Sequence, residues 1–176
     1  MIMGVYSTNT GAICDLSGLG LGEAAAAAKA KVIHQRILKR ICRHIDDLLL
    51  PRFEAVNEGE IGKPNSEIPD IVIWSLKSNM QHNKPIVAIE ITTDDYEQDN
   101  KKKLQNLYEK YPTLQECFLF NYESNTWKIV CRTGFTLPHS HSSYLNGKYG
   151  IYCDFNEPLV DCDIKNLFGI AKRKRT

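Results

Sequence analysis

The chain has 176 residues, which is the usual length of one domain, and 43% of them are hydrophobic, enough to form a core without disulfides. Its 22 Lys and Arg residues nearly balance its 21 Asp and Glu residues. The resulting formal net charge of +1 excludes a protein that binds polyanions through its overall charge, so any attraction to nucleic acid must come from local clusters of cations.

The six cysteines lie at wide spacings without a CxxC pair, and several fall in apolar runs. This pattern is typical of a reduced protein, because a buried thiol packs as a small hydrophobe. The apolar stretch 18–30 lacks the basic start of a secretory signal, and the charged residues that follow it exclude a membrane span. We therefore expect a cytoplasmic protein without a membrane segment.

Residues 1–21 are rich in Gly, Ser, Thr and Asn without any period, and they predict an irregular N-terminal arm. From about residue 22 to residue 50, hydrophobic residues recur every three or four positions, which predicts a long amphipathic helix that ends at Pro51. We expect a single domain over residues 22–170 and a basic tail over residues 171–176.

Two runs rich in Ile and Val, at 68–74 and 85–92, predict two β-strands. The polar run 77–84 between them predicts that the strands form a hairpin. A weaker alternating pattern at 52–60 predicts a strand before the hairpin, and the composition of residues 62–66 is that of a turn.

A second helix is predicted to begin after Asp94, because Asp94 and Glu97 have the spacing of a capping box, and to run to about residue 111. Further strands are predicted at 116–122, 126–132 and 149–155, before a short terminal helix. The segment 133–148 is rich in turn-forming residues. This order of elements predicts an α/β fold in which helices flank a mixed β-sheet.

Each strand of the hairpin carries one acid, Asp70 in the first strand and Glu90 in the second. If the turn is centred near Met80, residues whose numbers sum to about 160 stand opposite each other, which pairs Asp70 with Glu90 at the open end. Two neighbouring carboxylates repel each other unless a cation neutralises them, and Mg²⁺ binds such oxygen ligands. The alternative is that both acids are surface residues at the exposed end of a hairpin.

Asp99 and Lys103 are four residues apart on the second predicted helix and share one of its faces. Lys103 could reach back over the sheet to the carboxylates, where an ammonium group would orient a water nucleophile or stabilise the charge of a transition state. Lys101 and Lys102 compete for this role from other faces of the helix. The alternative is a surface ion pair between Asp99 and Lys103, which would contribute little to stability.

The basic tail is a candidate for salt-dependent contact with DNA phosphates, although a terminal charge run is more often simply solvated. Its cations are Lys172, Arg173, Lys174 and Arg175. Zinc-type ligands are also present, but none of the tight pairings that define a tetrahedral zinc site occurs among them. These ligands are Cys131, His139, His141, Cys153 and Cys162.

The residues around the two acids resemble a known group, the PD-(D/E)xK nucleases. Pro69 and Asp70 match the PD element of that superfamily, and the strand segment 86–93, which contains Glu90, matches its (D/E)x element. The resemblance covers about residues 34–130.

Within this superfamily the chain is most similar to the Uma-type, restriction-endonuclease-like family. Members have an early helix near a His, matched by His34, and a helix with Asp and Lys four apart, matched by Asp99 and Lys103. Thr93 stands at a Ser position of the family, and residues 116–121 match its strand with an aromatic pair. The resemblance gives His34 and Asp99 supporting positions around the site.

The resemblance implies a restriction-endonuclease-like core and a metal-dependent endonuclease that hydrolyses phosphodiester bonds in DNA. Asp70, Glu90 and the backbone carbonyl of Ile91 would bind Mg²⁺, with Mn²⁺ as the alternative ion. Thr92 stands where the superfamily signature has Lys, and it would act as a supporting residue. Catalysis would then depend on a migrated cation, for which Lys103 is the best match.

The sequence is also compatible with two other interpretations. One is a catalytically inactive domain of the same fold that binds nucleic acid or a protein partner. The other is a structural module whose acids lie on the surface. By analogy with restriction enzymes, which cut both strands as dimers, a homodimer is also expected.

Overall fold

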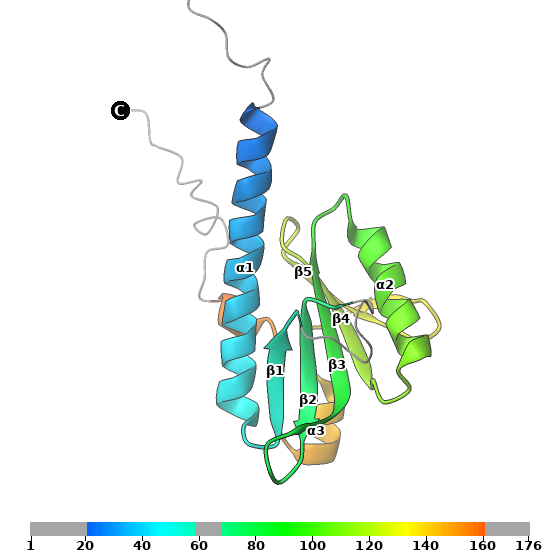
Figure 1. Ribbon diagram of the computed structural model, residues 1–176. Coiled ribbons are helices and arrows are strands. Elements are labelled where there is room, and N and C mark those ends of the chain that lie inside the picture. Colours follow the sequence, from blue (N-terminus) through cyan, green and yellow to red (C-terminus); the bar gives the residue numbers. More distant parts are fainter. Residues whose placement is uncertain (1–20, 59–67, 161–176) are drawn as a thin grey trace, which may run out of the picture.

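The computed structural model describes residues 21–58 and 68–160, which form a mixed six-stranded sheet with helices on both faces (Figure 1). The strands are β1 (Phe53–Asn57), β2 (Ile71–Leu76), β3 (His82–Thr92), β4 (Glu116–Asn121), β5 (Thr126–Val130) and β6 (Thr136–Pro138). The helices are α1 (Leu21–Leu49), α2 (Glu97–Lys110), α3 (Ser143–Tyr149) and α4 (Glu157–Val160). Strands neighbour one another in chain order, and β3 and β4 are parallel while the other pairs are antiparallel. The predicted α/β fold with a mixed, helix-flanked sheet is confirmed.

Two hydrophobic cores hold the helices against the sheet. On one face, the apolar stripe of α1 is buried against the strands through residues such as Ile37, Ile41 and Ile45. On the other face, Leu104 and Leu107 of α2 pack against neighbouring strand residues. Burial of these side chains is the main favourable contribution to folding, and it places α1 and α2 on opposite sides of the sheet (Figure 1).

The β2–β3 hairpin has the predicted register at its open end. Ile71 pairs with Ile89 and Val72 pairs with Ala88, so paired residue numbers sum to 160 there. The chain reverses at residues 77–81, where Met80 has a positive φ of 62° and Lys77 N donates to Gln81 O at 2.9 Å. Because pairing continues as far as His82, β3 begins three residues earlier than predicted.

The predicted capping box at the start of α2 is wrong. The N-cap residue is Tyr96, and it makes no side-chain cap hydrogen bond. Asp94 Oδ1 and Glu97 Oε2 instead accept hydrogen bonds from Asn121 Nδ2, at 2.7 and 3.0 Å. Asn121 is almost fully buried, and a buried amide group needs hydrogen-bond partners. The carboxylates of Asp94 and Glu97 therefore bind Asn121 and do not cap the helix.

The predicted strand at 149–155 is also wrong, because helix α3 ends there and only an isolated bridge joins His141 to Asp154. A buried carboxylate, Glu116, organises this segment by accepting hydrogen bonds from Ser142 Oγ and Tyr144 N. Ser142 also caps α3. These contacts join residues far apart in the chain, which is why the local composition indicated only turns.

The predicted N-terminal arm, the turn at 62–66, Cys162 and the basic tail fall outside the described residues. Over the part of the chain that the structure describes, no helix is long and apolar enough to span a membrane.

Candidate active site

The two carboxylates predicted to pair come together at the open end of the β2–β3 hairpin. Asp70 directly precedes β2 and Glu90 lies on β3. Since Ile71 faces Ile89, continuing the antiparallel register by one residue places Asp70 opposite Glu90. The Glu90 side chain is only 2% exposed, and that of Asp70 is 18% exposed. The alternative that both acids lie freely on the surface does not fit this burial.

Lys103 of α2 forms an ion pair with Glu90, one of these two carboxylates. Its Nζ lies 2.7 Å from Glu90 Oε1, so the helix that follows β3 returns over the sheet with Lys103 facing Glu90. Lys101 and Lys102 form no ion pair with either acid in the described residues. Asp99, which is four residues before Lys103 on the helix, is exposed. The ion-pair partner of Lys103 is Glu90.

Burial governs the electrostatics of Glu90. Its pKa is raised from 4.5 to about 7, mainly because burial removes water from the carboxylate and secondly because Asp70 repels it. The positive charge of Lys103 opposes this rise. A carboxylate with such a pKa changes its protonation state near neutral pH. Perturbed groups of this kind cluster at functional sites, which makes Glu90 a candidate for chemistry as well as for structure.

Asp70 is held in place by two other elements. His34 Nε2 of α1 lies 3.0 Å from Asp70 Oδ2, and the Ile91 amide of β3 donates to the same oxygen at 2.7 Å. The hydrogen bond to Asp70 raises the pKa of His34, and partial burial of the ring opposes this effect. Within the described residues both of these contacts use Oδ2, and together they fix the orientation of the carboxylate.

Thr92 occupies the position of the signature Lys and brings no charge to the site. It is buried two residues after Glu90, on the same side of β3, and its hydroxyl donates to the carbonyl of Thr93 at 3.1 Å. The positive charge near Glu90 therefore comes from the helix rather than from the strand.

A polar network beside the site was not predicted. Asn121 pairs with Thr92 across the parallel strands β3 and β4, and its amide group bonds Asp94 and Glu97. Glu97 also forms an ion pair with Lys128 of β5. The network fastens the first turn of α2 to the sheet and so positions the helix that carries Lys103. In the sequence, only the presence of an Asn at the end of an apolar strand indicates such a network.

The structure describes four of the five zinc-type residues, Cys131, His139, His141 and Cys153. His139 and His141 lie with their ring centroids 4.0 Å apart. Across residues 21–58 and 68–160, however, no group of three or more His, Cys, Asp or Glu side chains is arranged to hold a metal ion. At the hairpin, Asp70 and Glu90 provide two carboxylates, so an ion there would also need backbone or water oxygens.

The raised pKa of Glu90 predicts a specific pH dependence of stability. Because the folded protein binds this proton more tightly than the unfolded chain, the stabilising contribution is complete below about pH 4.5 and is lost as the pH rises through about 7. In metal-free buffer, wild type should therefore lose about 2 to 3 kcal/mol of unfolding free energy relative to Glu90→Gln between pH 5 and pH 8. Urea unfolding of both proteins measures this difference, and parallel pH profiles would contradict it.

Comparison with known proteins finds similarity in structure but not in sequence. No family model matches the sequence, and a search of curated proteins finds no match. Among solved structures, the chain is similar to a protein of DUF820 from Anabaena variabilis ATCC 29413 that is described as a candidate nuclease. The TM-score is 0.50 and the sequence identity 17%, over 78% of this chain and 80% of that one. Similarity at this level of identity shows the fold alone, and membership of the Uma-type family stays a prediction. The chain is thus an α/β domain with the restriction-endonuclease-like fold.

Proposed function

We propose that this protein is a metal-dependent endonuclease that hydrolyses phosphodiester bonds in DNA. The observation that carries the proposal is the buried Glu90 carboxylate, which the strand register places opposite Asp70 and which Lys103 contacts at 2.7 Å. A lysine paired with a buried carboxylate that has a second carboxylate opposite it is the arrangement expected of an active site rather than of a surface ion pair. The structural similarity to a candidate nuclease supports the same class of reaction by analogy of fold.

The donor set fits a hard divalent ion such as Mg²⁺ or Mn²⁺. Two carboxylates that are kept from water and repel each other, as the raised pKa of Glu90 indicates, are the groups that such an ion would stabilise. The Ile91 amide points toward Asp70, and in a strand the carbonyl of a residue faces the same neighbour as its amide. That carbonyl is therefore a suitable third oxygen ligand. When bound, the ion would act as a Lewis acid and lower the pKa of a water molecule.

The remaining side chains would orient the reacting groups. The Lys103 ammonium, whose side chain is 28% exposed, would hold the attacking water or donate to a phosphate oxygen as negative charge develops. His34 would act as a positioning residue, since it contacts Asp70 rather than the space in front of the carboxylates. Asp99, which is exposed, would support substrate binding only indirectly.

One observation favours a second candidate function. Thr92 is neutral at the signature position, and Lys103 is already paired with Glu90. A catalytically inactive domain of the same fold, binding nucleic acid or a protein partner, would show the same two features. Under either function we place the protein in the cytoplasm, with the basic tail Lys172–Arg175 as an additional DNA contact. A homodimer would bring two sites to the two strands.

Cleavage of supercoiled plasmid tests the proposal. With Mg²⁺ or Mn²⁺, the wild-type protein should convert supercoiled DNA to nicked and linear forms, and excess EDTA should abolish this conversion because the ion is removed. If neither ion produces nicking over a broad range of protein concentrations, the enzyme assignment fails and the inactive DNA-binding domain becomes the better assignment.

A further inference from the structure

Helix α1 carries a row of cations that the candidate active site does not use. Between residues 29 and 43 it has six Lys and Arg residues and no acid, in a chain whose formal net charge is only +1. These residues, the basic face of α1, are Lys29, Lys31, Arg36, Lys39, Arg40 and Arg43. All six are exposed. They represent six of the 22 Lys and Arg residues of the whole chain, concentrated on one helix.

The helical period gathers most of these cations on the outer side of α1. At about 100° per residue, all of them except Lys31 fall within an arc of about 100°, opposite the buried stripe that contains Ile37 and Ile41. The row from Lys29 to Arg43 is about 21 Å long. Lys31 lies on the flank of the helix, where it lines a pocket of about 320 Å³ together with His34 and Ile91.

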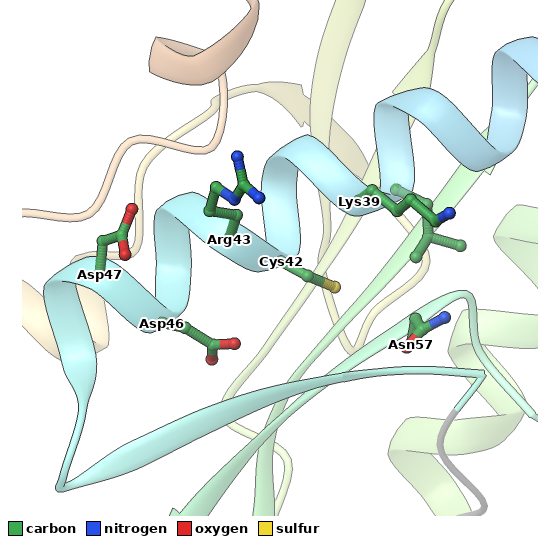
Figure 2. Close-up of a pocket in the computed structure, with 7 residues that line it drawn as sticks. Lys39, Cys42, Arg43, Asp46, Asp47 and Asn57 are labelled. Carbon is green, nitrogen blue, oxygen red and sulfur yellow. The ribbon is translucent and has the colours of Figure 1, made fainter.

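Of the acids near the row, Asp46 and Glu157 have other partners, and the exposed Asp47 lies one turn beyond Arg43. Asp46 accepts a hydrogen bond from the Ala55 amide at 2.8 Å, and Glu157 pairs with His44. Figure 2 shows Asp46 on the side of α1 that faces β1, whereas the Arg43 side chain extends from the other side of the helix. Within the described residues, none of the six cations of the basic face forms an ion pair. Neighbouring like charges on a helix repel one another, and a polyanion would relieve this repulsion.

We infer that the basic face of α1 docks the phosphate backbone of DNA. The choice of polyanion rests on the proposed function, and α1 itself supplies the link, because the same helix brings His34 to Asp70 and Lys31 to the pocket beside Ile91. Lys31, on the flank of α1, is the member of the basic face that lines this pocket, so a backbone held along the row would approach the candidate active site past Lys31. An anionic membrane fits less well, since an interfacial helix needs an apolar face to insert, and that face of α1 is buried in the core.

Salt-dependent DNA binding tests the inference. Fluorescence anisotropy with a labelled duplex, with Ca²⁺ in place of Mg²⁺, should compare wild type with the triple variant Arg36→Gln, Lys39→Gln, Arg43→Gln. The control, Lys77→Gln, Lys84→Gln, Lys110→Gln, removes the same charge from the hairpin turn, from the start of β3 and from the last turn of α2. Loss of three phosphate contacts should lower the slope of log K against log salt by about 3 and weaken binding at 0.1 M salt at least about tenfold, whereas the control should change neither quantity appreciably.

The outcomes separate this inference from the proposed function. If wild type nicks plasmid but the α1 variant keeps the wild-type slope, the docking surface is wrong and the endonuclease assignment stands. If wild type does not nick plasmid but the slope falls only in the α1 variant, the docking surface stands and the enzyme assignment fails. Binding to vesicles containing phosphatidylserine without binding to DNA would overturn the inference. If the triple variant loses its far-UV circular dichroism signal, Arg40→Gln alone should still lower the slope by about 1.

Discussion

Asp70→Asn and Glu90→Gln are each expected to lower metal-dependent nicking of supercoiled plasmid by about a thousandfold. Each substitution keeps the size of the side chain but replaces an anionic oxygen ligand with a neutral amide, and stabilisation of the transition state by a bound ion amounts to several kcal/mol. The rate of loss of supercoiled DNA at fixed Mg²⁺ concentration measures the effect. Mg²⁺ should also raise the Tm of the wild-type protein, and this increase should be absent in both variants.

Glu116→Gln is the matched control for these two substitutions. Glu116 is also a buried strand carboxylate, 6% exposed, but it binds Ser142 and the Tyr144 amide near α3 rather than facing Asp70. Its substitution should lower the Tm and leave nicking at 25 °C within a few fold of wild type. Nicking that survives in Asp70→Asn or Glu90→Gln would show that the carboxylate pair is not the metal site.

Lys103→Met is expected to lower nicking by about a hundredfold, while Lys103→Arg should retain a larger share of the activity. Methionine has a similar length but no charge, so both Glu90 and the reacting phosphate lose the ammonium at the site. Single-turnover cleavage with protein in excess of plasmid measures the chemical step separately from product release.

Lys102→Met provides the control on the same helix, because Lys102 is exposed and lies one position away. This variant should nick plasmid at close to the wild-type rate. Equal losses in Lys102→Met and Lys103→Met would mean that general charge on α2, rather than contact with Glu90, determines the rate. Wild-type activity in Lys103→Met would remove Lys103 from the mechanism.

The hairpin and its acid pair could be predicted from the sequence because short-range rules determine them. Two Ile- and Val-rich runs around one polar turn allow few registers, and the two-residue period of a strand then places Asp70 opposite Glu90. The long helix α1 was equally clear from the period of its apolar residues. The position of Lys103 followed from its place on the helix after β3, but only packing could choose it over Lys101 and Lys102. Burial of Leu104 and Leu107 fixes that rotation of α2.

The remaining features depend on contacts between distant residues, which local patterns do not encode. Asn121 hydrogen-bonds Asp94 and Glu97, the two acids whose spacing predicts a helix cap. Glu116 binds the segment around Tyr144, for which the local composition predicts only turns. A family resemblance gave His34 a supporting position, but its contact with Asp70 was not predicted, since no spacing rule connects residues 36 positions apart. The Lys and Arg residues of α1 are evident in the sequence, but they predict no role by themselves. That they share one exposed face becomes clear only from the burial of the apolar stripe opposite them.

The two halves of the candidate site differ in how much chain must be ordered to build them. Glu90 and Lys103 both lie on the continuous β3–α2 segment, so their contact closes a short loop, and short loops cost little entropy to close. The contact between His34 and Asp70 joins residues 36 positions apart and requires α1 to dock on the β2–β3 hairpin, so a longer loop must close to form it. Local unfolding of α1 would therefore remove the His34 contact from Asp70, while the Ile91 amide contact and the Glu90–Lys103 pair would remain. A polyanion bound along α1 would oppose that unfolding, so substrate binding would help to complete the site that acts on it.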